Sequence, residues 1–133
     1  MLTYINKARA FTLVEIMIVV AIIALLATLA LPSLLRARKR SQATTVLEEL
    51  RLIDAAVDQY AIEFGKSKGQ AVSWDAVKSY LKEGSLLYNS LPNDRLGNPY
   101  AAQAVDALPK VNATTFGALS DVAPVEFWSP FAP

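Results

Sequence analysis

The chain begins with a long apolar segment that contains a single charged position. Between Leu13 and Leu35 the only ionisable residue is Glu15, and the run from Ile16 to Leu31 has no charge and no glycine. A helix of about 20 apolar residues spans a bilayer. A cleaved secretory signal peptide would have a shorter apolar core followed by a small-residue cleavage site, whereas this run leads directly into basic residues. The pattern therefore favours a membrane anchor.

A second pattern, that of an amphipathic helix, follows the apolar segment. Apolar residues recur at spacings of 4, 3, 4, 3 and 4, which fit one helical face: Val46, Leu50, Ile53, Val57, Tyr60 and Phe64. Gly65 is a suitable C-terminal stop. From Phe11 to Phe64 only Pro32 breaks helical propensity, so we expect one helix of about 54 residues, roughly 80 Å long.

Pro32 removes one backbone hydrogen bond, and its position predicts a local kink in this helix. A tolerated membrane-helix proline and a functional flexible point both fit this position.

Residues 65–133 have the pattern of a small head built from short elements. Residues 73–81 read SWDAVKSYL, which predicts a helix with Ser73 as N-cap. We expect short strands at Tyr100–Val105 and Val125–Trp128, and one helical turn at Thr114–Leu119. The aromatic tail, residues 127–133, could form an adhesive patch, but we expect it to fold back onto the core. The predicted fold class is α+β: one long N-terminal helix packed against a small C-terminal head.

Composition removes several function classes. The 133 residues include no histidine and no cysteine, which excludes His-dependent triads, cysteine nucleophiles, disulfides and His/Cys metal sites. The net charge is +1, and residues 41–133 alone carry seven basic and eleven acidic groups. This mildly acidic head argues against nucleic acid as the main partner. Nothing groups the remaining reactive side chains, so we expect no enzyme.

The basic residues pose a question about orientation. Residues 1–10 carry two positive charges, and residues 36–40, which we call the basic collar, carry four. The positive-inside rule taken alone would place the head in the cytoplasm.

Glu15 places a carboxylate inside a membrane helix, which is costly, although less so towards the helix end than at its centre, and such residues usually have a partner. If the chain were cut before Phe11, the new α-amine would be a cation in the same apolar layer. It would lie one turn from Glu15 in one subunit, or near the Glu15 of the next. By position alone, a glutamate reaching the lipid headgroups explains the residue as well.

The segment from Lys7 to Ala24, with the sequence KARAFTLVEIMIVVAIIA, resembles the N-terminus of a type IV prepilin. The resemblance extends over residues 6–42. It implies a leader (1–10), a transmembrane and assembly half (11–35), an amphipathic half (36–64) and a head (65–133). It also implies cleavage between Ala10 and Phe11 by a prepilin peptidase, and N-methylation of Phe11. The family usually has glycine before the cut, where this chain has Ala10.

Further roles follow from the same resemblance. Phe11 and Glu15 would act in assembly between subunits, and Pro32 matches the helix-kinking proline of the family. Family members insert into the inner membrane with the head outside the cytoplasm, and an assembly platform then builds them into a homo-oligomeric helical filament. On orientation we follow the resemblance against the charge rule, because the motif is residue-specific and the rule is statistical.

A shorter stretch in the head, Leu91–Tyr100, is similar to the Asp-Pro-x-Gly-Asn-Pro-Tyr segment of major pseudopilins of type II secretion systems. An ordinary double turn rich in Asn, Pro and Gly explains it as well. Those pseudopilins are thought to bind calcium through a head loop. After Asp106 this chain has only Asp121 and Glu126 as acidic residues, which are too few to support the calcium site that the resemblance makes possible, and we expect no other cofactor.

The leading prediction is therefore a structural pilin or pseudopilin, and the lack of cysteine favours the pseudopilin, because many pilus pilins close a loop with a disulfide. The alternative is a single-pass anchored binding or adaptor protein, for example one used in competence-type DNA uptake, that does not polymerise.

Overall fold

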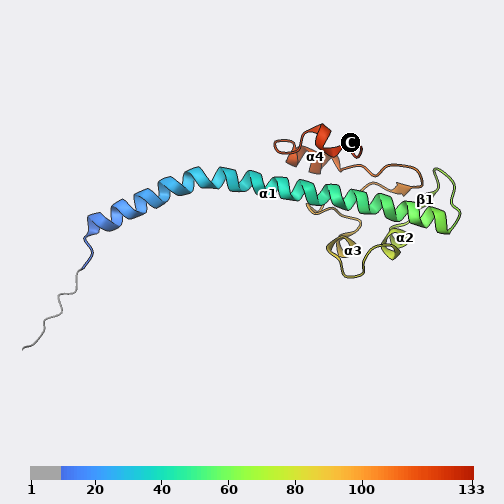
Figure 1. Ribbon diagram of the computed structural model, residues 1–133, viewed down its shortest axis with the longest axis horizontal. Helices are drawn as coiled ribbons and strands as arrows, with labels where there is room; N and C mark the ends of the chain where they lie inside the picture. The colour runs from blue at the N-terminus through green and yellow to red at the C-terminus, as the bar shows by residue number, and fades with distance from the viewer. Residues whose placement is uncertain (1–9) are drawn as a thin grey trace, which may run out of the picture. The chain divides into compact units, whose positions relative to one another are not determined.

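The structure is a computed structural model, and it describes residues 10–133. The chain divides into two compact units between Leu35 and Arg36. One helix, α1 (Leu13–Glu63, 51 residues), contributes to both units (Figure 1). The prediction of one long helix that continues through the proline is thus confirmed. Its ends lie two residues inside the predicted start and one residue inside the predicted end.

In the first unit, the helix carries apolar side chains that nothing in the described chain covers. This part of α1 is long and apolar enough to cross a membrane, and its apolar window is 0% buried. Its few hydroxyls are satisfied within the helix: Thr28 donates to the Leu25 carbonyl at 2.7 Å and Ser33 to the Ala30 carbonyl at 2.8 Å. Pro32 lies inside α1. The kink at this residue stays a prediction.

In the second unit, α1 contributes buried apolar side chains to the hydrophobic core of the head. The predicted apolar stripe is buried at Val46, Leu50, Ile53 and Val57, each at most 2% exposed. The prediction is wrong for the last residue of the stripe, because Phe64 is 59% exposed. It lies just beyond the end of α1, where the chain turns away and the head no longer covers it.

The short helices of the head are capped by their own sequence. The structure confirms the predicted helices as α2 (Trp74–Ser79) and α4 (Ala113–Leu119). The Ser73 hydroxyl accepts a hydrogen bond from the Ala76 amide at 3.2 Å, which is the predicted N-cap. A further helix, α3 (Leu86–Ser90), was not predicted. Within the second unit, α2 and α3 lie on one side of α1 and α4 on the other (Figure 1).

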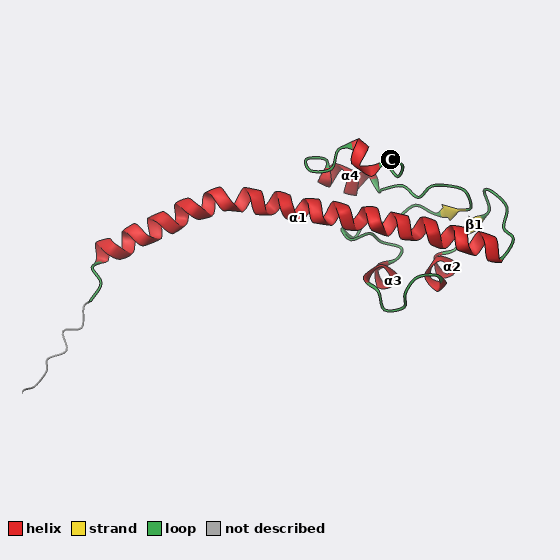
Figure 2. Ribbon diagram, viewed as in Figure 1, coloured by secondary structure: helices red, strands yellow, loops and turns green. Residues whose placement is uncertain are grey.

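Strand is sparse in the head (Figure 2). β1 (Ala71–Val72) pairs antiparallel with β2 (Gln103–Ala104), so the strand expected at residues 100–105 is reduced to two residues. The strand predicted at residues 125–128 is wrong. Val125–Trp128 form a 3₁₀ turn, η1, because the local backbone hydrogen bonds close between residues three apart.

The aromatic tail folds back onto the core, as predicted. Trp128 is fully buried and Phe131 is 4% exposed. The Trp128 indole N–H donates to the Ala123 carbonyl at 3.1 Å, which satisfies its one polar atom.

Candidate assembly and processing site

The predicted processing residues lie at the exposed start of the described chain. Ala10 and Phe11 precede α1, and the Phe11 side chain is 80% exposed. Ala10, Phe11, Thr12 and Glu15 line one open depression at the helix N-terminus. The structure therefore brings three of the four predicted site residues together. Pro32 lies 17 residues after Glu15 on the same helix, about 25 Å along it at 1.5 Å per residue.

Thr12 and Glu15 form a capping box at the start of α1. The Glu15 amide donates to the Thr12 hydroxyl oxygen at 3.2 Å, and the Glu15 carboxylate accepts from the Thr12 amide at 2.8 Å. The same carboxylate oxygen also accepts from the Thr12 hydroxyl at 3.0 Å. The two amides satisfied in this way are among those that the first helical turn would leave without a partner.

Sequence reasoning missed the role of Thr12. The signal was present, since Ser or Thr followed three residues later by Glu before an apolar run is the sequence pattern of a capping box. The box gives the Glu15 carboxylate a local partner within one subunit. The pairing of Glu15 with the α-amine of a cleaved chain stays a prediction.

The apolar surface that follows is large. Along the first unit the bulky side chains from Leu13 to Leu35 are at least 50% exposed. Such a surface is stable in lipid or against other apolar helices, and unstable in water.

The segment that resembles pseudopilins forms a braced double turn in the head. Asp94, 3% exposed, accepts from the amides of Leu96 and Asn98 at 2.9 Å each, and its second carboxylate oxygen accepts from the hydroxyl of the fully buried Thr115. The Asn98 side-chain amide donates to the same Thr115 hydroxyl at 2.8 Å. This network fastens the turn to α4. Asp94 and Asn98, which an ordinary turn would explain, therefore also hydrogen-bond to the buried Thr115 of α4.

The same segment is fastened to α1 through Tyr100. Its hydroxyl donates to Glu49 at 2.9 Å, and both side chains are 5% exposed. Burial raises the pKa of the Glu49 carboxyl, and the hydrogen bond from Tyr100 opposes that shift. Burial and the neighbouring Glu49 also raise the pKa of the Tyr100 hydroxyl.

The head offers a poor set of ligands for calcium. No three Asp, Glu, His or Cys side chains gather anywhere in residues 10–133. Asp121 is paired with Lys39, whose ammonium donates to both carboxylate oxygens at 3.0 and 3.1 Å. Glu126 is exposed on η1. Calcium takes six to eight oxygen ligands, usually including several carboxylates, so these residues do not fit the ion that the resemblance implies.

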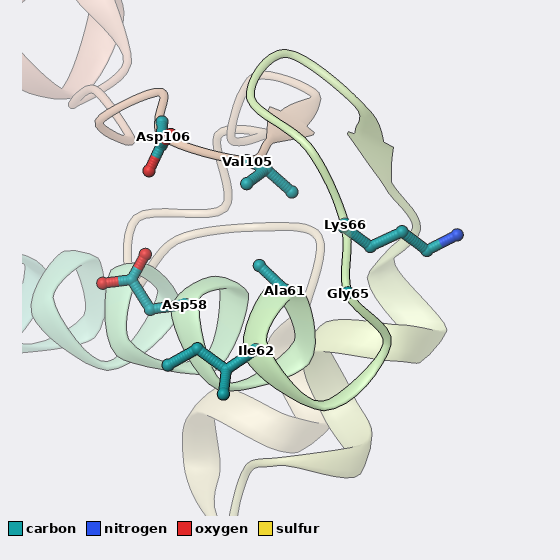
Figure 3. A pocket seen from close by; sticks show the side chains of 7 residues that line it. All are labelled: Asp58, Ala61, Ile62, Gly65, Lys66, Val105 and Asp106. Carbon is teal, nitrogen blue, oxygen red and sulfur yellow. The ribbon is translucent and has the colours of Figure 1, made fainter.

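An open pocket of about 450 Å³ lies at the C-terminal end of α1 (Figure 3). Asp58 and Asp106 contribute carboxylates to it from different segments, and the Lys66 side chain points away from both in Figure 3. The other lining residues are Ala61, Ile62, Gly65 and Val105. The lining contains no Ser, Thr, Cys or His, so it offers no hydroxyl or thiol nucleophile paired with an imidazole base.

Comparison with known proteins gives the family. Residues 5–31 match the model of the prokaryotic N-terminal methylation motif. The chain is 31% identical over 105 residues to the type II secretion system core protein G of Pseudomonas aeruginosa, covering 71% of this chain and 72% of that protein. The chain belongs to the type IV pilin and type II secretion pseudopilin family.

Two further relatives define the extent of the similarity. The core protein G of Aeromonas hydrophila is 25% identical over 122 residues and covers 84% of each chain. The type IV wide pilus major component PilA4 of Thermus thermophilus is 43% identical over 58 residues, 44% of each chain. No solved structure gives a significant match. A match over 71% of 133 residues necessarily extends beyond α1 into the head.

Proposed function

We propose that this chain is a structural subunit of a type IV pilus-like filament, and that the filament is the pseudopilus of a type II secretion system. The observation that carries the first part is the motif Ala10–Glu15 at the start of an apolar helix that the subunit leaves uncovered. The second part is supported by the extent of the alignments. The alignments to the core proteins G of Aeromonas hydrophila, Pseudomonas aeruginosa and Escherichia coli cover 71–84% of the chain and reach into the head, whereas those to the wide-pilus component and to the core protein G of Klebsiella pneumoniae each cover 44%.

Processing would come first. A prepilin peptidase would cut between Ala10 and Phe11 at the cytoplasmic face, and Phe11 would then be N-methylated. Both residues are exposed ahead of α1, which suits access by an enzyme. Alanine keeps a small side chain at the position where the family usually has glycine. The mature subunit would be anchored in the inner membrane with its head outside the cytoplasm.

Assembly would then exchange one apolar environment for another. An assembly platform would draw the helix out of lipid, and the same exposed side chains would pack against the helices of neighbouring subunits. Since lipid and protein are both apolar, the exchange itself gives little selectivity. Close packing and the pairing of a Phe11 α-amine with Glu15 would supply it. Glu15 would give up its bonds to Thr12 to pair in this way.

The role of Glu15 is tested by Glu15→Ala, with Glu48→Ala as the matched control. Glu48 is an exposed carboxylate on the same helix, ion-paired to Arg51 at 2.5 Å within the head. We expect Glu15→Ala to insert and be cleaved normally but to yield few filaments, and Glu48→Ala to assemble like the wild type. Normal filaments from Glu15→Ala would remove the assembly role of this residue.

The type of filament is tested by where the subunit is found. We expect it in the membrane fraction of cells at normal expression, with secreted enzymes retained inside cells that lack the gene. Abundant subunit in sheared surface material, with secretion intact, would show a surface pilus instead. A subunit that never enters filaments would point to the anchored, non-polymerising binding protein. We propose no catalytic activity.

A further inference from the structure

The C-terminal segment of the head, residues 111–133, is held against the chain at two levels. In the interior, Trp128 is fully buried and the buried Thr115 hydroxyl donates to Asp94, while the Val111 amide closes the segment on itself at the Phe131 carbonyl, 2.9 Å away. At the surface, Lys39 on α1 is ion-paired to Asp121, which follows α4 and is 82 residues away in sequence. This ion pair joins the part of α1 that begins the second unit to the C-terminal segment.

The surroundings of Asp121 are basic. The hydrogen bond from Lys39 lowers the pKa of the Asp121 carboxyl, and the charge of Arg36 acts in the same direction. Both oxygens of the carboxylate already accept from one ammonium group. A divalent cation at this carboxylate would have to displace the ammonium and would meet the positive charge of the basic collar, residues 36–40.

We propose that the Lys39–Asp121 ion pair does in this head what a bound metal ion would otherwise do, so that closure of the C-terminal segment is independent of calcium. This inference goes beyond the proposed function and holds for a pilus and a pseudopilus alike. An ion pair as exposed as this one contributes little stability alone. Burial of Trp128 supplies most of the closure, and the ion pair sets where the segment rests on α1.

Thermal unfolding of the full-length protein in detergent micelles, followed by near-UV circular dichroism, tests this. We expect the same midpoint, within about 1 °C, in excess calcium and in EGTA. Lys39→Glu should lower the midpoint in EGTA, because two carboxylates then face each other. Calcium should recover part of that loss, and magnesium less of it. The double variant Lys39→Asp with Asp121→Lys should return the midpoint towards the wild type without calcium.

Arg51→Glu is the matched control, since it also reverses one charge of an exposed ion pair on α1, facing Glu48. That pair lies within one helix, so we expect a smaller loss of stability. A wild-type midpoint that rises in calcium, with the rise abolished by Asp121→Asn, would overturn the proposal. So would a stable Lys39→Glu variant, or a double variant that recovers nothing.

Discussion

Tyr100→Phe removes a single hydroxyl from the buried contact between the head and α1. That hydroxyl is the donor to Glu49, whose carboxylate is 5% exposed. The ring would keep its packing, including its tilted contact with Trp74, in which the two ring centroids are 6.3 Å apart. The variant therefore isolates the hydrogen bond from the burial of the aromatic side chain.

The expected loss follows from leaving a buried carboxylate without its donor. A buried acceptor that loses its partner costs about 1–3 kcal/mol, and more when it is charged. For a domain of this size each kcal/mol lowers the unfolding midpoint by roughly 4–8 °C. Glu49→Gln should lose far less stability than Tyr100→Phe at pH 7, because it removes the buried charge while its amide oxygen can still accept a hydrogen bond from Tyr100.

The pH dependence gives a second measure of the same contact. Because burial raises the Glu49 pKa above its ordinary value of 4.5, the folded state holds the proton more tightly than the unfolded chain. The stability from Glu49 is therefore fully present below pH 4.5 and is lost as the pH rises through the folded pKa. Tyr100→Phe removes a hydrogen bond that lowers the Glu49 pKa, so the stability that this variant loses should be larger at pH 7 than at pH 4. Glu49→Gln should flatten the profile.

Unfolding of the full-length protein in micelles by urea, at several pH values, measures these differences. Tyr88→Phe is the control, since no hydrogen bond of the Tyr88 hydroxyl is found within the described part of the chain. A Tyr100→Phe variant as stable as the wild type, or a Glu49→Gln variant that loses as much as Tyr100→Phe, would refute the reasoning.

Three further predictions follow from the same head. Leu50→Ala should lower the free energy of unfolding by about 2–5 kcal/mol, because Leu50 is fully buried at the centre of the apolar stripe. Chemical denaturation measures this loss, and a loss below about 1 kcal/mol would place the core elsewhere. Asp94→Ala should cost at least about 2 kcal/mol in the same assay, because it leaves the two amides and the Thr115 hydroxyl without their acceptor. Because the pKa of Asp121 is lowered in the folded state, its contribution to stability is present above pH 3.8 and is lost as the pH falls. Lys39→Met should weaken this loss of stability at acidic pH, and an unchanged dependence of stability on acidic pH would contradict the pairing.

The long helix could be predicted because its signals are local. An uncharged apolar run and a regular 3-and-4 spacing specify a helix whatever packs against it. The cap at Ser73 is local in the same sense and was predicted, whereas the cap at Asn112 is equally local and was not predicted. The capping box at Thr12 and Glu15 was equally local and was overlooked.

What could not be predicted depends on contacts distant in sequence. Glu49 is a charged residue on a helix, and its burial follows from Tyr100, 51 residues later. The strand expected at residues 125–128 failed because apolar and aromatic content does not reveal whether a strand edge is available to pair with. The Lys39–Asp121 ion pair, likewise, joins a residue of the basic collar to a carboxylate that the sequence analysis had considered only as a calcium ligand.

The central claim is that this chain is cleaved before Phe11 and works as a filament subunit. Mass spectrometry of the N-terminal peptide, from native membranes and from purified filaments, tests it most directly. The account predicts a peptide that begins at N-methylated Phe11 in both samples. A chain that retains the residues before Phe11 in every fraction would have no α-amine beside Glu15, and it would contradict both the processing and the assembly that we propose.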